Sequence, residues 1–519
     1  MATVSLSSAS GKWIMVSTIM ASAMAFIDGT ALNVVLPAIQ KSMHASGTDL
    51  FWMLNAYLLM LASLMLIGGS LGDKLGRKRI FITGILIFII GSTACGMAGN
   101  VTLLIIFRVL QGIGGALMIP GSLSLISSSI NEDQRGKAIG TWSAFTTVVT
   151  IGGPVLGGAL ADAGYWRYIF FINVPIGIVA VLILWKKVKE SVADDDDKTL
   201  DFPGAAAIAL GLAAVTFGFL RIPEIGFNNW EVPVSLGAGL LLLTAFIVIE
   251  QKSRHPMMPL SLFRNMTFSG ANLLTLFLYA GLGAGMLFLS LNLVQAQGYD
   301  QLQSGLTFLP FTILMVFVAR FAGTLADKYG PKLLLTIGPA VAGTGLLMLS
   351  FVGQTPGPSA YFSTFFPGIV VLGLGMSFTV APLTATVMGA VSDQHSGTAS
   401  GINNALSRIA GVFANAILGA LAVLFFSGSL KQELSALPLN ETSKQAVMQQ
   451  TGELGNAKAP SSLNEADKEK VTRLYHSSFV AAYQKIMRIA GCLGILGALM
   501  SVVFIRNSAV RAAPVPVPE

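Results

Sequence analysis

The chain has 519 residues, of which 53% are hydrophobic and only 11% are charged, and its formal net charge is +7. Soluble domains carry roughly 25% charged residues, so this composition excludes an ordinary soluble protein and indicates one embedded in a lipid bilayer. Most of the basic residues fall in short loops between apolar runs. We therefore interpret them as signals of membrane topology and not as a surface that binds nucleic acid.

Cysteine and histidine are too sparse to indicate a disulfide framework or a metal centre. Cys95 and Cys492 both lie inside apolar runs, and the four histidines are far apart in the sequence, at or near loops. No cofactor is predicted from these residues. The first apolar run is too long for a signal peptide and lacks a small-residue cleavage site, so we expect it to remain as a helix.

The apolar runs predict fourteen membrane-spanning helices, because a bilayer core needs about 20 apolar residues per helix. An even number places both termini on one side. The loops on one side are rich in lysine and arginine, whereas the opposite loops hold few, chiefly Lys41, Arg167 and Arg221. By the positive-inside rule both termini are cytoplasmic. The expected spans are 13–40, 50–72, 79–98, 102–127, 137–162, 166–186, 203–221, 233–250, 268–293, 303–325, 332–352, 361–388, 400–426 and 475–505.

Four segments outside the spans are polar. We expect cytoplasmic linkers at 187–202, which contains four consecutive aspartates, and at 251–267. Residues 427–474 are predicted to form a loosely ordered external loop, with room for a short helix near Glu465–Tyr475. The proline-rich tail, 506–519, is predicted to be disordered in the cytoplasm.

One charged stretch between two apolar runs occurs twice. Gly69 to Lys78 reads GSLGDKLGRK, and Gly323 to Lys332 reads GTLADKYGPK, with six identities in ten positions. Each copy is expected to form a tight turn between two helices. A generic basic hairpin would explain one copy, but two copies at matching places in the hydropathy pattern indicate two related halves.

Asp28 and Arg108 are ionisable residues inside the first and fourth apolar runs. A charge at bilayer depth is costly unless it is paired or hydrated, so we expect Asp28 to face a water-filled cavity. At 1.5 Å rise per residue, Asp28 lies about 15 Å and Arg108 about 9 Å below the outer boundary, a difference that an arginine side chain can bridge. We predict a buried pair in which Asp28 carries a proton. A purely structural ion pair is the alternative.

The fifth apolar run carries a glycine-rich segment with one proline. Pro154 removes a backbone donor, and the glycines permit close helix crossing. This composition suits a seam that opens and closes, although a static kink would have the same sequence. The predicted seam residues are Gly152, Gly153, Pro154, Gly157 and Gly158.

Taken together, these motifs resemble the major facilitator superfamily, and specifically its branch of fourteen-helix drug:proton antiporters. Residues 69–78 resemble the family's loop after the second helix, residues 26–37 the branch's first-helix motif, residues 108–116 its arginine–glycine motif, and residues 152–158 its antiporter motif. Residues 166–175 resemble the branch's entry to the sixth helix. The likeness covers nearly the whole chain.

The resemblance implies an all-α integral membrane protein with the major facilitator fold. Two six-helix bundles, 1–186 and 268–505, would flank two inserted helices at 203–250. It also implies a monomer in a bacterial plasma membrane that is not an enzyme and uses the proton gradient in place of a cofactor. Residues in and beside the repeated loops would latch the cytoplasmic gate. For the charged ones the alternative is a weak surface salt bridge. These residues are Gly69, Asp73, Gly76, Arg77, Lys78, Asp133 and Asp327.

The expected function is export of amphipathic drugs, antiseptics or dyes by alternating access. The later helices carry almost no acidic residue at membrane depth, so we expect lipophilic substrates that are monocationic or neutral. Candidate cavity residues are Phe26, Asn33, Trp52, Tyr57, Gln111, Trp142, Phe145, Phe277, Tyr279, Asn403 and Arg408. The alternatives are a proton-coupled transporter of a lipid or another physiological solute and, from another class, a membrane-embedded enzyme or sensor.

Overall fold

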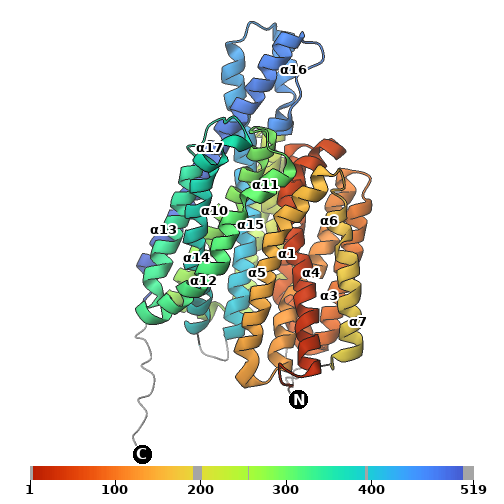
Figure 1. Ribbon diagram of the computed structural model, residues 1–519, viewed down its shortest axis with the longest axis vertical. Coiled ribbons are helices and arrows are strands. Elements are labelled where there is room, and N and C mark those ends of the chain that lie inside the picture. The colour runs from red at the N-terminus through yellow and green to blue at the C-terminus, as the bar shows by residue number, and fades with distance from the viewer. Residues whose placement is uncertain (1–3, 191–200, 255, 392–395, 507–519) are drawn as a thin grey trace, which may run out of the picture.

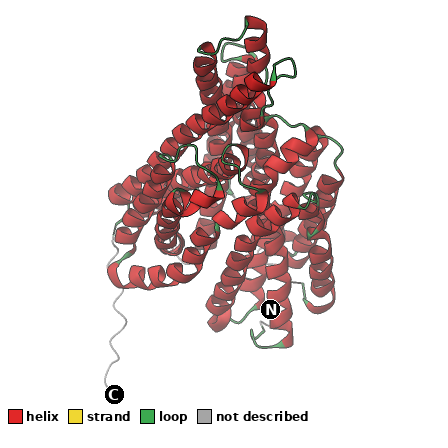
Figure 2. Ribbon diagram, turned by 45° about the horizontal axis from the view of Figure 1, so that its top comes forward, coloured by secondary structure: helices red, strands yellow, loops and turns green. Residues whose placement is uncertain are grey.

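The computed structural model describes residues 4–190, 201–254, 256–391 and 396–506. Within these ranges some helical side chains, including those of Asp73, Asp133 and Asp327, lie outside the description. The described residues form long helices that run roughly along the long axis of the molecule (Figure 1), and no strand is drawn among them (Figure 2).

The first bundle contains six spans. Asn100 caps α4, and its side chain accepts a hydrogen bond from the backbone N–H of Leu103 at 2.9 Å. The sixth span is made of two helices, α6 and α7, that join at Ile172. The helices are α1 (Ala9–Met43), α2 (Gly47–Leu75), α3 (Arg77–Met97), α4 (Val101–Ser129), α5 (Glu132–Asp162), α6 (Tyr168–Phe171) and α7 (Asn173–Lys187).

Two inserted helices, α8 (Phe202–Ile225) and α9 (Glu231–Lys252), follow the first bundle and pack on each other. α8 also contacts α2 of the first bundle and α15 of the second. The second bundle begins after a short helix, η1 (Leu260–Arg264). It comprises α10 (Met266–Gln295), α11 (Gln301–Thr307), α12 (Leu309–Tyr329), α13 (Pro331–Leu349), η2 (Pro358–Ser363), α14 (Phe365–Gly389), α15 (Ser396–Ser435), α16 (Glu441–Met448), η4 (Thr451–Asn456) and α17 (Glu465–Phe504).

Within the described residues, thirteen segments are long and apolar enough to cross a membrane, counting α6 with α7 and α11 with α12 as one span each. α5 (Glu132–Asp162), which packs on α1 and α11, brings the number of long helices or spans in the described residues to fourteen, two of them the inserted helices. The predicted fold class, two six-helix bundles with two inserted helices, is confirmed. We call the end that carries the α2–α3 turn the inner end and the opposite end the outer end.

The two copies of the repeated stretch form equivalent helix-to-helix turns at the inner end. Gly76 joins α2 to α3 with φ +108°, and Gly330 joins α12 to α13 with φ +83°. Positive φ is readily available only to glycine, so each turn depends on its glycine.

The start of the linker packs on the first of these turns, which the sequence did not indicate. The backbone N–H groups of Lys78 and Arg79 donate to the carboxylate of Glu190 at 2.9 and 3.1 Å. The Lys78 ammonium donates to the carbonyl of Val188 at 2.7 Å. The Glu190 carboxylate lies at the N-terminus of α3, where the helix dipole is positive. This favourable interaction stabilises the turn.

Residues 427–474 are not loosely ordered, and that expectation was wrong. α15 continues to Ser435, α16 and η4 follow, and α17 begins at Glu465, so the segment forms a helical cap beyond the bundles, with α16 at the top of Figure 1. Apolar packing holds the cap, because Val447, Leu454 and Tyr475 are fully buried and belong to the same apolar core as the bundles. The Tyr475 hydroxyl also donates to the Val447 carbonyl at 3.0 Å.

Candidate functional site

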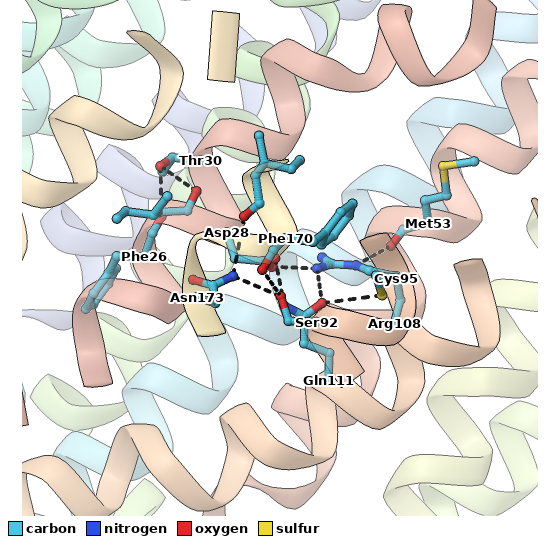
Figure 3. A network of polar contacts seen from close by, with 12 residues as sticks. Phe26, Asp28, Thr30, Met53, Ser92, Cys95, Arg108, Gln111, Phe170 and Asn173 are labelled. Carbon is cyan, nitrogen blue, oxygen red and sulfur yellow. Dashed lines mark hydrogen bonds and ion pairs between the residues drawn. The ribbon is translucent and has the colours of Figure 1, made fainter. Parts of the chain in front are cut away.

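The structure brings Asp28 of α1 and Arg108 of α4 into direct contact. The Arg108 guanidinium donates to one carboxylate oxygen of Asp28, and the Gln111 amide donates to the other at 2.8 Å. Gln111 also accepts from Arg108 at 2.8 Å, which closes a three-residue ring (Figure 3). Because Gln111 lies one turn after Arg108, a single face of α4 supplies both donors to the acid.

Arg108 has further partners that hold it independently of Asp28. Its Nε donates to the Met53 carbonyl of α2 at 3.2 Å, and the guanidinium lies 4.3 Å from the centre of the Tyr57 ring. The contact with Tyr57 is of cation–π type. Three helices, α1, α2 and α4, therefore meet at this one guanidinium.

Asp28 and Arg108 are each only 1% exposed. The expectation that Asp28 faces a water-filled cavity is therefore wrong for this conformation. The pair is hydrogen-bonded on both sides, which offsets the cost of burying the two charges.

A second polar chain lies close to the pair and links α3 to the sixth span (Figure 3). The Ser92 hydroxyl donates to the Phe170 carbonyl at 2.8 Å, and the Asn173 amide donates to Ser92 at 3.0 Å. All three residues are fully buried. These bonds fix the position of the break between α6 and α7.

The glycine-rich segment of α5 contacts both bundles. A side-chain carbon at Gly153 or Gly157 would collide with Thr30 or Ala31 of α1, within the same bundle. At Gly158 it would lie 2.7 Å from the Cα of Leu302 in α11, which belongs to the other bundle. Pro154, for its part, lies against Gly305 of α11, and an added carbon at Gly152 would meet nothing within 4 Å. The tight contact between the bundles therefore involves Pro154 and Gly158.

Asp162, at the end of α5, strengthens this contact with the other bundle. Its two carboxylate oxygens accept from the backbone N–H groups of Gln301 and Leu302 at 2.8 and 2.7 Å. Figure 1 shows α11 beside α1 and α5 in the upper part of the molecule. Asp162 was not among the residues predicted from the sequence. The available signal was an acid four residues after Gly158, at the end of an apolar run.

A cluster of amides adds a further contact at the outer end. The Gln40 side chain of α1 accepts from Gln295 of α10 at 2.7 Å and from Asn456 of the cap at 2.9 Å. Its own amide donates to the Glu453 carbonyl at 3.0 Å. α1, α10 and the cap are thus joined by one side chain.

The proposed latch residues lie at the inner end, but only some of them are described. Gly69 lies in α2, Arg77 and Lys78 lie in the first turn of α3, and Gly76 joins the two helices. The side chains of Asp73, Asp133 and Asp327 lie outside the described residues. The latch therefore stays a prediction.

The candidate cavity residues have varied surroundings, and their role in a cavity stays a prediction. Phe26 and Trp142 pack edge to face at 6.4 Å, whereas Trp52 packs against Phe217 of inserted helix α8. The Asn33 carbonyl accepts from Ser290 of α10 at 3.1 Å. Phe145 is 55% exposed and Phe277 is half-buried. Among the first-bundle candidates, Tyr57 and Gln111 contact the ion pair.

The second bundle has its own polar contact at membrane depth. The Asn403 amide of α15 donates to Asn272 at 3.0 Å and to Thr275 at 2.6 Å, both on α10. Arg408 lies further along α15, and its side chain is half-buried.

Two bundles of membrane helices, with repeated turns and a buried ion pair in one of them, define a secondary transporter. The chain belongs to the Major Facilitator Superfamily, whose family model matches residues 18–415. This is a family of transporters and not of enzymes.

The relatives of the chain include exporters. It is 27% identical over 480 residues to the tetracenomycin C resistance and export protein of Streptomyces glaucescens, covering 92% of this chain and 88% of that one. It is 31% identical over 415 residues to the multidrug resistance protein Stp of Mycobacterium tuberculosis, covering 79% and 76%.

Among solved structures, it resembles a bacterial homologue of the human lysosomal transporter Spinster in an inward-facing, unoccupied conformation. The TM-score is 0.68 at 18% identity, with 98% of this chain and 100% of that one covered. At this identity the likeness shows the fold alone.

Proposed function

We propose that the protein is a proton-driven antiporter that exports amphipathic drugs, antiseptics or dyes by alternating access. The observation that carries the proposal is the Asp28 carboxylate, which is 1% exposed and held by Arg108 and Gln111 in the middle of a bundle. A titratable acid at membrane depth is usually functional, because its burial is too costly to be kept for packing alone. The drug-resistance and export functions named for its relatives support the choice of substrates.

In this mechanism Asp28 takes up and releases the coupling proton. Protonation removes the attraction between α1 and α4, whereas Arg108 keeps its bonds to Met53 and Gln111 and its contact with Tyr57. The arginine therefore still has two hydrogen-bond acceptors after Asp28 is protonated. Since Asp28 is buried in this conformation, proton exchange requires a state in which water reaches it.

Alternating access then requires the contacts at the two ends of the molecule to break in turn. The contacts of Gly158, Asp162 and Gln40 would close the outer end, and the latch residues, with Asp73 and Arg77 central, would close the inner end. Breaking either set allows the bundles to rock around the centre.

The proposal also includes the oligomeric state, the membrane and the energy source. The protein acts as a monomer in a bacterial plasma membrane, with both termini cytoplasmic, and the proton gradient serves where other proteins use a cofactor. The sequence predicts lipophilic substrates that are monocationic or neutral.

Transport in inverted membrane vesicles tests the proposal. A gradient that is acidic inside should drive accumulation of one or more dyes from a panel of cationic, neutral and anionic amphiphiles, and a protonophore should abolish it. Accumulation driven only by the opposite gradient would favour the alternative, a proton-coupled importer of a lipid or another solute. Accumulation that the gradient does not change would refute proton coupling.

A further inference from the structure

Arg408 is a charged side chain within a spanning helix that the proton mechanism does not use. It lies ten residues into the span Thr398–Ser435, about 15 Å from its inner end at 1.5 Å per residue. Its side chain is half-buried, and in the described part of the chain no residue forms a hydrogen bond or an ion pair with it. A guanidinium has five N–H donors, and leaving them unpaired in hydrocarbon is costly. Arg408 must therefore face the protein interior or water.

The packing of α15 places this side chain where the two bundles meet. A side-chain carbon at Gly411 would lie 3.7 Å from Leu58 of α2, and one at Gly283 of α10 would lie 3.8 Å from the Cα of Gly411. α2, α10 and α15 thus converge at one level. Arg408 precedes Gly411 by three residues, about one helical turn, on the same side of the helix.

Tyr279 occupies the equivalent place on α10, because it precedes Gly283 by four residues and α10 and α15 run in the same direction. The contacts of Gly411 with Leu58 and with Gly283 show that this side of α15 meets α2 and α10. The guanidinium therefore faces the junction of the bundles and not the lipid.

The charges at this junction do not balance. The carboxylate of Asp28 is already engaged by Arg108 and Gln111. On the opposite side, Asn403 bonds to Asn272 and Thr275, all of them neutral. Among the described residues, the centre thus contains one neutralised ion pair and one further positive charge. A lipophilic cation would be repelled there and an anion attracted.

We infer that Arg408 binds an anionic group of the transported molecule, such as a carboxylate or a phenolate. The substrates would then be anionic or zwitterionic amphiphiles and not the monocationic or neutral ones that the sequence predicts. A planar guanidinium can bind a carboxylate with two parallel hydrogen bonds, which gives orientation as well as attraction. This inference rests on the proposed transport function and adds the chemical class of its substrates.

Binding of two dyes that share a xanthene skeleton tests the inference. Fluorescein carries a carboxylate and a phenolate, whereas tetramethylrhodamine methyl ester is a cation. Fluorescence anisotropy is measured with the full-length protein in neutral detergent and without a pH gradient, so a failure of proton coupling would not affect the result. The wild-type protein should bind fluorescein about tenfold more tightly than the rhodamine ester, as one charge-assisted hydrogen bond would provide.

Three variants complete the experiment. Arg408→Gln should weaken fluorescein binding about tenfold and leave the rhodamine ester unchanged, whereas Arg408→Lys should retain part of the preference because it keeps the charge. The matched control is Arg488→Gln, since Arg488 is an exposed arginine of α17 and should not matter. Thermal melting of each variant checks folding. Preference of the wild type for the rhodamine ester, no binding of fluorescein, or unchanged fluorescein binding in Arg408→Gln would overturn the inference.

Discussion

The two bundles differ in whether their central group of hydrogen-bonded side chains contains a titratable residue. In the first bundle the carboxylate of Asp28, the guanidinium of Arg108 and the amide of Gln111 form a closed ring, and this ring contains a carboxyl group. In the second bundle, Asn403, Asn272 and Thr275 form a comparable cross-helix contact with no titratable group in it. The repeated turns at Gly76 and Gly330 show that the bundles share a plan. The shared plan does not extend to the chemistry of the two centres.

This difference suggests a division of roles between the bundles. Coupling to protons requires a site whose interactions change when a proton binds, and in the proposed mechanism the contact of α1 with α4 in the first bundle is that site. The amides of the second bundle keep the same hydrogen bonds at any physiological pH, so they fix the spacing of α10 and α15. Substitutions can test this division, because each one changes a single centre or the seam between the bundles.

Asp28→Asn should have the largest effect, because it makes the first centre as insensitive to protons as the second. We expect gradient-driven dye transport in inverted vesicles to fall by more than about 100-fold. The thermal midpoint should stay within a few degrees, since the amide can still accept from Arg108. Asp49→Asn, at the capping box of α2, is the matched control and should transport normally. Full activity of Asp28→Asn would exclude Asp28 as the coupling acid.

Asp162→Asn should have an intermediate effect, because it weakens the outer contact between the bundles without touching either centre. The carboxylate accepts from two backbone N–H groups of α11, and a neutral amide loses the charge assistance of both bonds. We expect turnover to change about three- to tenfold and the outer end to open more often.

Spin labels can measure that opening. Tyr165 and Leu306 are exposed near the outer ends of α5 and α11, and cysteines at these positions can be labelled once the exposed Cys492 is replaced by serine. The population at longer label separations should rise in Asp162→Asn. Asp300→Asn is the control, because Asp300 caps the same helix from within its own bundle. Identical distance distributions for the two variants would mean that Asp162 does not hold the bundles together.

The features that could be predicted from the sequence are those in which a residue type is conspicuous in its own segment. Asp28 and Arg108 stand out because charges are rare in apolar runs, and helix geometry alone placed them at compatible depths. The contacts of Asp162 and Glu190 could not be predicted in this way, because each accepts from backbone N–H groups of a distant segment and so depends on the assembled fold.

The outer cap shows a second limit of sequence-based prediction. Residues 427–474 are polar overall, which suggested loose order, but a few of their apolar residues are buried. Val447, Leu454 and Tyr475 belong to the apolar core that also includes residues of the bundles, so their burial depends on the assembled fold. Composition averaged over the segment hides these few residues.

Asn403→Ala should have the smallest effect and tests the other side of the comparison. It removes two hydrogen bonds between α15 and α10, at 3.0 and 2.6 Å, and leaves no charge unpaired. We expect a loss of stability of about 1–2 kcal/mol, measured by thermal unfolding in detergent. The dependence of transport on the pH gradient should be unchanged. Asn404→Ala is the control, because Asn404 is exposed and its amide donates only to Ser400 of its own helix. If Asn403→Ala instead shifted the pH dependence of transport, proton coupling would involve both centres and the division of roles between the bundles would be wrong.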